Sequence, residues 1–179
     1  MNTSDNRPHV WRAFSFLVII AGLIIWWVNS MSNEDPLWFL RNFNAQADWI
    51  VVYHDGDTSM FFPGDRAYER IMDAFADGVA HWSGYEGGVG LSDENLERFR
   101  AEWEILELHF NKPVKVHTRH LYSEARNFFI PLMGTHAEYR RVFAGLTDKP
   151  RIGVVNMSAD RFAALLQAVA EAVPTVDGK

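Results

Sequence analysis

Seven histidines are the residues of this 179-residue chain that most readily suggest metal chemistry. His117 and His120 are three residues apart, but a strand would place them on opposite faces of a sheet. His54 and His109 can meet only if their strands are neighbours. The chain has no H-E-x-x-H motif and no cysteine, which excludes Cys-ligated zinc and iron–sulfur sites and C-x-x-C-H haem attachment. We therefore expect no metal site and no cofactor.

Candidate nucleophiles are also without a supporting motif. No serine lies in a G-x-S-x-G elbow, and Ser92 and Ser158 are better explained as helix caps. The glycine-rich stretch 83–90 lacks the G-x-x-x-x-G-K-[ST] pattern of a phosphate loop and is interpreted as a flexible connector. A pair of catalytic carboxylates remains open, but no spacing points to one. The sequence predicts a protein that is not an enzyme and has no catalytic residue.

One polar constellation has a geometric basis. Lys115, His117 and Arg119 alternate with apolar or small residues, so a strand would place the three on one face, and Arg140 and Arg141 follow later in the chain. Our hypothesis is a basic sheet face that binds an acidic partner surface or anionic lipid headgroups. The alternative is an ordinary solvated face.

The elements that must position these residues begin with an apolar stretch near the N-terminus. Residues 13–28 contain no charged side chain, and the apolar span of 11–31 approaches the ~20 residues that cross a bilayer as a helix. Trp11 lies at one end, and Trp26 and Trp27 at the other, where indole rings favour the membrane–water interface. The sequence predicts a single transmembrane anchor in contact with the lipid bilayer.

The charges around this span predict its orientation. Arg7 and Arg12 precede it and acidic residues follow it, which places residues 1–10 in the cytoplasm as a tail and residues 32–179 outside. The predicted location is the cytoplasmic (inner) membrane. A signal peptide cleaved near residues 28–30 is the alternative; the length of the apolar run and the bulky Trp pair favour a retained anchor.

Residues 32–47 are predicted to form a juxtamembrane connector. Asp35 can cap a short helix with Pro36 at its first position. This helix would carry too much apolar surface for a free linker, with Trp38 and Phe39 among its side chains. We expect it to lie in the membrane interface or to pack on its own domain; packing on a neighbouring protein is the alternative.

Residues 48–173 are predicted to form one extracytoplasmic α+β domain, and residues 174–179 a disordered tail. A hairpin turning at Asp55-Gly56 is followed by helices that begin near Asp65 and Ser92. Strands are then expected, with a turn at 111–113, and Ser158 caps a final helix. The expected strands after the hairpin cover residues 104–110, 114–119, 127–132, 139–144 and 151–156. This order predicts a mainly antiparallel sheet with helices packed on one face.

The charge is unevenly distributed along the chain. Residues 34–104 hold fifteen acidic and five basic residues, a net of −10, whereas residues 111–151 hold eight basic and three acidic, a net of +5. A two-faced domain that docks by charge complementarity is one interpretation. The other is that the two halves interleave in the fold and neutralise each other. The outside location and the net charge of −6 argue against nucleic acid as a partner.

The architecture resembles that of small single-pass accessory subunits of bacterial respiratory and photosynthetic complexes, and most of all the small subunit of alternative complex III in filamentous phototrophs. The shared features are one N-terminal anchor ending in Trp26 and Trp27, one outside α+β domain, and no haem or cluster ligand. The resemblance implies a non-catalytic subunit that docks on integral-membrane subunits of an electron-transport complex. The docking residues would then be Trp26, Trp27, Trp38, Phe39, Lys115, His117 and Arg119. The alternative function is a free-standing anchored binding domain for an envelope ligand.

Overall fold

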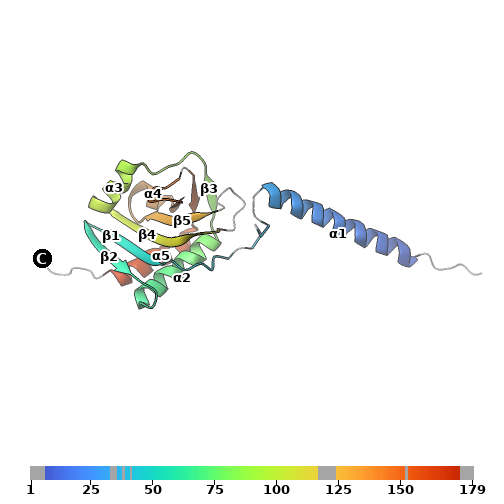
Figure 1. Ribbon diagram of the computed structural model, residues 1–179, viewed down its shortest axis with the longest axis horizontal. Coiled ribbons are helices and arrows are strands. Elements are labelled where there is room, and N and C mark those ends of the chain that lie inside the picture. The colour runs from blue at the N-terminus through green and yellow to red at the C-terminus, as the bar shows by residue number, and fades with distance from the viewer. Residues whose placement is uncertain are drawn as a thin grey trace, which may run out of the picture.

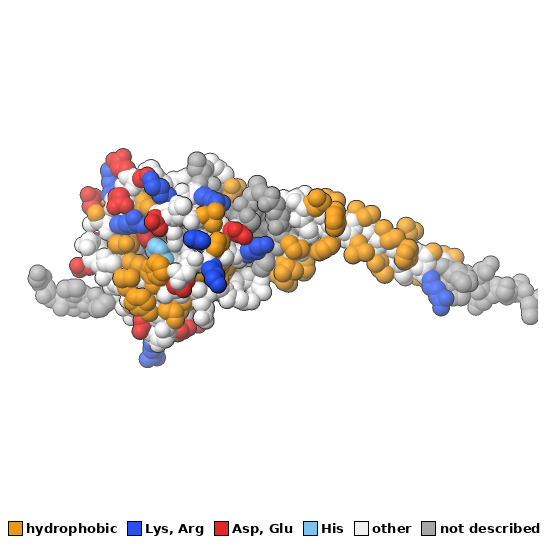
Figure 2. Space-filling view, in the orientation of Figure 1, with side chains coloured by type: hydrophobic (Ala, Val, Ile, Leu, Met, Phe, Trp, Pro, Cys, Tyr) orange, Lys and Arg blue, Asp and Glu red, His pale blue; other side chains and the backbone are white. Residues whose placement is uncertain are grey.

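The molecule consists of a long N-terminal helix followed by an α+β domain (Figure 1). A computed structural model describes residues 7–32, 36–37, 39–40, 42–116, 124–151 and 153–173. Helix α1, Arg7–Ser32, contains a 23-residue span, Val10–Ser32, with a mean hydropathy of 2.0 and no part of it buried against the domain. Its length and composition suit a membrane crossing. Figure 2 shows its surface as a nearly continuous band of hydrophobic side chains.

Seven strands form one sheet in which every neighbouring pair is antiparallel, in the order β2-β1-β4-β5-β6-β7-β3. The α+β prediction is therefore confirmed. The strands are β1 Trp49–His54, β2 Asp57–Phe61, β3 Gly84–Glu86, β4 Glu104–Val114, β5 Ala125–Pro131, β6 Arg141–Gly145 and β7 Val154–Asn156. The predicted hairpin is β1–β2, and its turn residues Asp55 and Gly56 have φ angles of 49° and 83°. Two positive φ angles in succession are the requirement of the tight turn that asparagine, aspartate and glycine favour.

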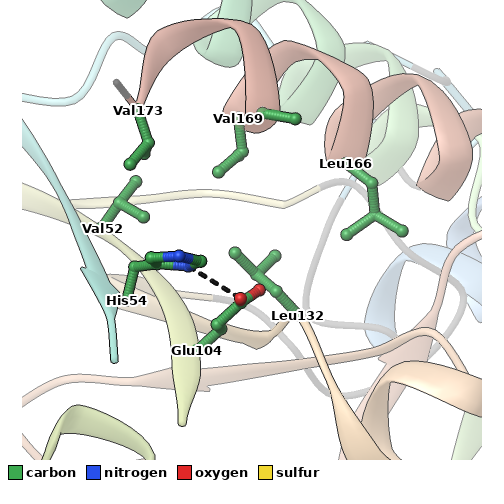
Figure 3. A pocket seen from close by; sticks show the side chains of 8 residues that line it. Val52, His54, Glu104, Leu132, Leu166, Val169 and Val173 are labelled. Atoms are coloured by element: carbon green, nitrogen blue, oxygen red, sulfur yellow. Dashed lines mark ion pairs between the residues drawn. The ribbon is translucent and has the colours of Figure 1, made fainter. Parts of the chain in front are cut away.

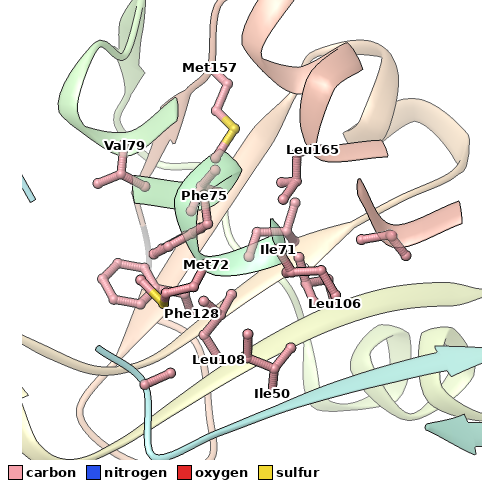
Figure 4. Packing of buried hydrophobic residues seen from close by; sticks show 14 of the residues in the cluster. Ile50, Ile71, Met72, Phe75, Val79, Leu106, Leu108, Phe128, Met157 and Leu165 are labelled. Atoms are coloured by element: carbon pink, nitrogen blue, oxygen red, sulfur yellow. The ribbon is translucent and has the colours of Figure 1, made fainter. Parts of the chain in front are cut away.

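Two helices cover one face of the sheet and enclose the main core. Helix α2, Arg66–Ala80, and helix α5, Ala159–Ala172, pack side by side on it (Figure 1). Four phenylalanine rings meet at one end of this core: Phe128 lies 5.1–5.9 Å from the centroids of Phe43, Phe75 and Phe110. Figure 4 shows Phe75 and Phe128 among the aliphatic residues of the same layer. The apolar face of each of these two helices is therefore the face that packs on the sheet.

The opposite face of the sheet carries a second, smaller apolar cluster under helix α3, Asp93–Glu102, with the short helix α4, Gly134–Glu138, beside it. Helix α3 begins where the sequence predicts a helix, after Ser92, whereas α4 was not predicted; both lie on the face opposite α2 and α5. Ser92 caps α3 as expected, since its Oγ accepts a hydrogen bond from the Asn95 amide at 3.2 Å. Asp65 precedes α2, but its carboxylate accepts from the Phe62 amide instead of capping the helix.

The observed sheet differs from the predicted one in two larger respects, besides shifts of one to three residues at the ends of β5, β6 and β7. The predicted turn at residues 111–113 is part of β4, which continues to Val114 through an irregularity in its pairing with β5. Asp48 holds this extension because its carboxylate accepts hydrogen bonds from both nitrogens of Asn111, at 2.6 and 2.7 Å. Residues 84–86 of the glycine-rich connector form the edge strand β3 on β7. Local turn signals were outweighed at both places by hydrogen bonds to segments distant in sequence.

The connector is not helical where the structure describes it. Pro36 and Leu37 lie in a turn, and Trp26 Nε1 donates a hydrogen bond to the Pro36 carbonyl at 3.1 Å. Phe43 is buried in the main core, in T-shaped contact with Phe75 at 5.5 Å. The connector therefore packs on its own domain at this residue, while Phe39 stays half exposed.

Candidate binding pocket

A pocket of about 190 Å³ opens between the end of the sheet and the C-terminal half of α5. Figure 3 shows the side chains of α5 on one side and those of β1 and β4 on the other. The lining residues are Val52, His54, Glu104, Leu132, Leu166, Val169, Ala170 and Val173. Six of these eight are aliphatic, so the pocket is an apolar space with a polar pair at one side.

Local sequence determines which side chains reach this space. Strand alternation points Val52 and His54 toward the helix-covered face, together with the core residue Ile50. Glu104 is the first residue of β4 and lies opposite His54 in the antiparallel register. Both polar residues therefore lie at strand ends, outside the main core. Leu166, Val169 and Val173 follow the three- and four-residue spacing of one helix face.

The polar pair is geometrically well defined. His54 Nδ1 lies 2.7 Å from Glu104 Oε1, and the two side chains are 47% and 29% exposed. Asp55 Oδ2 lies 3.7 Å from the other ring nitrogen of His54. Asp57 is paired with His54 across the hairpin and shares its face of the sheet. Acidic groups therefore outnumber basic groups around the pocket mouth.

A metal ion is not what this arrangement suggests. In the described ranges, no group of three or more His, Asp or Glu side chains is close enough to hold one. An encounter of His54 and His109, which required neighbouring strands, does not occur either. The strands of His54 and His109 are neighbours, but Trp49 pairs with His109 and Glu104 with His54, and the two rings lie on opposite faces.

A second polar cluster lies on the opposite face of the sheet around the buried carboxylate of Glu107. The side chain of Glu107 is 1% exposed and accepts two hydrogen bonds from Arg100, at 2.7 and 3.1 Å, and one from His109 Nε2 at 3.2 Å. Burial by itself raises the pKa of Glu107, but these hydrogen bonds and the two positive charges outweigh it and lower that pKa below its ordinary value. Glu107 is therefore ionised at neutral pH.

The hydrogen bonds of this cluster also hold the ring of His109 in place. The amide nitrogen of Asn127 donates to the Thr147 carbonyl at 2.8 Å, which turns its oxygen toward His109 Nδ1 at 3.0 Å. The ring therefore lies between the Asn127 oxygen on one side and the Glu107 carboxylate on the other. It is stacked on Trp49 with centroids 5.0 Å apart. All of its polar atoms are engaged, so the cluster acts as an internal brace.

A third cluster joins β3 to β6 and β7. Arg141 donates to Glu86 at 2.7 Å, and Asn156 donates to the other oxygen of Glu86. Hydrogen bonds from Arg141 and Asn156 lower the pKa of Glu86. Arg141 also donates to His136 Nδ1 at 3.1 Å, which requires that nitrogen to be unprotonated. This cluster attaches the edge strand β3 to the sheet.

His136 is expected to weaken the fold at mildly acidic pH. Burial and the Arg141 guanidinium lower the pKa of His136. An unfolded chain binds its proton near pH ~6.5, whereas the folded chain binds it only at lower pH. The contribution of His136 to the free energy of unfolding should therefore be constant above about pH 7 and fall as the pH drops below about 6.5. Urea midpoints of the full chain in mild detergent at pH 7.5 and 5.5 measure this, and the loss should shrink in His136→Gln. An unchanged loss in that variant would contradict the assignment.

The structure distributes the predicted docking residues over separate places. Trp26 and Trp27 lie on α1, 40% and 60% exposed, and Phe39 is 52% exposed. Lys115 is exposed beyond the end of β4. Trp38, His117 and Arg119 lie outside the described residues. Of the predicted basic row, the structure therefore describes only Lys115. The binding role of this row stays a prediction.

The charged sheet face expected from the sequence differs from the observed one. Glu107 lies on the sheet face opposite the main core, where α3 covers it and Arg100 neutralises it. The interleaving of the two oppositely charged halves is confirmed at two ion pairs, Arg141–Glu86 and Lys149–Asp93, each of which joins an acidic residue of the first half to a basic residue of the second. Alternation gives the face of a residue but cannot tell which face a distant helix covers.

The pocket residues were missed at the sequence level. His54 and Glu104 are fifty residues apart in the chain, and only the β1–β4 register brings them together. A weak signal exists in retrospect, because each is a polar residue that stands at the end of a strand whose neighbouring residues on that face are apolar.

Comparisons with known proteins give a single point of reference. No protein-family model matches the chain, and no curated protein matches it. Among solved structures, the chain is similar to YycH from Bacillus subtilis, with a TM-score of 0.49 and 14% sequence identity over 71% of this chain. The similar region makes up 37% of the YycH chain. This finding overturns the predicted resemblance to the small subunit of alternative complex III, and the electron-transport function inferred from that resemblance is wrong.

Proposed function

We propose that the chain is a membrane-anchored binding domain that holds its pocket outside the cytoplasm, close to the membrane surface. The pocket beside His54 and Glu104 is the observation that carries the proposal, because it is a preformed apolar cavity with oriented polar groups. Helix α1 supports the anchoring, since its apolar span lies free of the domain. This function replaces the electron-transport subunit predicted from the resemblance.

The proposed orientation has the N-terminus in the cytoplasm and the domain outside, in the cytoplasmic membrane. The basic residues Arg7 and Arg12 before the span, with acidic residues after it, support this direction. The exposed tryptophans Trp26 and Trp27 would lie at the outer interface of the bilayer. The docking roles of Phe39, Lys115 and the other residues named above remain part of this proposal as candidate contacts with lipid or protein.

The absence of native cysteine permits a clean test of orientation. Met60→Cys places one thiol on the domain, where the native side chain is 51% exposed, and Thr3→Cys places one in the N-terminal tail. In intact spheroplasts, a membrane-impermeant maleimide should label Met60→Cys fully and Thr3→Cys only after permeabilisation. The two variants are each other's control. Equal labelling of both, or recovery of the domain without α1 by mass spectrometry, would contradict a retained anchor of this orientation.

A further inference from the structure

We propose that the pocket beside His54 and Glu104 binds an aliphatic primary ammonium group, of the kind carried by an alkylamine or a lysine side chain. This inference rests on the proposed binding function and specifies its ligand. The size of the pocket sets the first limit. At about 190 Å³ it is smaller than the ~300–1,000 Å³ typical of sites for drug-sized ligands, so it admits one group of side-chain size.

The lining selects an aliphatic chain. Val52 and Leu132 on the sheet side face Leu166, Val169 and Val173 on α5 (Figure 3). These side chains can shield several methylene groups of a bound chain from water, which favours binding. Apart from the imidazole of His54, no lining residue in the described part of the chain offers an aromatic ring on which a planar ligand would stack.

The charges around the pocket select a cation. Glu104 provides a carboxylate inside the pocket, and Asp55 and Asp57 stand beside His54 at its mouth. No lysine or arginine of the described chain lines the space. Helix α5 adds to this field, because Val173 at its C-terminus lines the pocket and the last carbonyl groups of a helix carry partial negative charge. An anionic ligand would meet repulsion from each of these groups.

Hydrogen-bonding capacity favours ammonium over guanidinium. Glu104 Oε1 is engaged by His54 at 2.7 Å, and among the described residues no hydrogen bond engages Oε2. A guanidinium binds a carboxylate best through both oxygens, whereas an ammonium is a compact charge that can bind a single oxygen. With its alkyl chain against Leu166 and Val169, an ammonium would donate one N–H group to Oε2.

A ligand titration of the full chain in detergent micelles tests the inference. Binding is followed by the methyl NMR signals of Val52, Leu132 and Val169. The probes are n-butylammonium and n-butanol, and the peptides acetyl-Gly-Lys-Gly-amide and its norleucine analogue. We expect the two ammonium probes to bind with affinities at least about tenfold higher than those of their neutral partners, as measured from the shifts of these signals. A charge-assisted hydrogen bond accounts for a difference of this size. Preference between the free amine and the lysine peptide identifies the source of the group.

Glu104→Gln should reduce ammonium affinity by at least about tenfold. Glu102→Gln makes the same change of charge on an exposed residue outside the pocket and should leave affinity unchanged. Equal affinities in the two variants, or equal binding of n-butanol and n-butylammonium, would overturn the ammonium assignment while leaving the binding function intact. Failure of all four probes to shift the pocket signals would instead overturn the pocket as a ligand site. A Leu166→Trp variant, which fills the space, should abolish binding of every probe.

Discussion

Replacement of Glu107 by alanine is expected to destabilise the domain by about 3–5 kcal/mol, a large fraction of the stability of a domain of this size. The carboxylate is almost fully buried and accepts hydrogen bonds from Arg100 and His109. The side chain of Arg100 is only 22% exposed, and a guanidinium does not deprotonate in proteins, so without Glu107 it would keep its charge with little access to water. The cost comes from this partly buried cation, which would keep only its exposed partner Glu97, more than from the lost attraction.

A matched control is available on the same guanidinium. Glu97 accepts from Arg100 at 2.9 Å but is itself 71% exposed, so Glu97→Ala should cost no more than about 1 kcal/mol. Urea unfolding of the full chain in mild detergent, monitored by near-UV circular dichroism, compares the two variants. Similar losses in both would refute the assignment of Glu107 as the buried centre of the cluster.

The same residue should contribute to acid sensitivity. Because the folded-state pKa of Glu107 is lowered, its contribution to stability is complete above the pKa of an unfolded glutamate, about 4.3, and is lost as the pH falls through the folded value. This acid limb lies below the one assigned to His136. The two should therefore be separable in a series of urea midpoints between pH 7.5 and 3.

Truncation of Phe128 to alanine is the second change with a large expected effect, about 3–5 kcal/mol. The ring is 1% exposed and touches Phe43, Phe75 and Phe110, which come from the connector, α2 and β4. Its removal leaves a cavity that three separate segments would have to move to fill. The loss should therefore lie at the upper end of the range for large-to-small changes in a core.

The control for this prediction is Phe62→Ala, which removes the same ring from a half-exposed position after β2. It should cost less than about 1 kcal/mol. Urea midpoints of the two variants measure the difference. A second readout is limited proteolysis near Phe43, because loss of Phe128 should release the connector from the core. Comparable stability of the two variants would contradict the central role of the aromatic cluster.

Elements with strong local signals were predictable from the sequence. The hairpin turn at Asp55-Gly56, the helices α2 and α5 and the Ser92 cap depend on neighbours within a few residues, and all are observed. Two features that were not predicted depend on distant partners. The extension of β4 relies on Asp48, sixty-three residues from Asn111, and β3 exists only because β7 lies beside it.

The candidate pocket illustrates the same limit. Neither His54 nor Glu104 has a sequence neighbourhood that marks it as functional, and the cavity depends on where α5 ends over the sheet. The basic row could be predicted because period-two alternation is visible within a single segment. Sites made by register and helix placement leave no comparable trace in one sequence.

The burial of Phe43 also determines how far the domain can reach. The chain is bound to α1 at Pro36 through Trp26 and to the core at Phe43, so the two points of attachment are only seven positions apart. Even fully extended, this segment spans no more than about 25 Å. With α1 in a bilayer, such a short tether holds the domain at the membrane and raises the effective concentration of a partner anchored in the same membrane. A weak intrinsic affinity for such a partner would then be sufficient for high occupancy, and lengthening the segment between Pro36 and Phe43 would lower that occupancy without changing any contact in the domain.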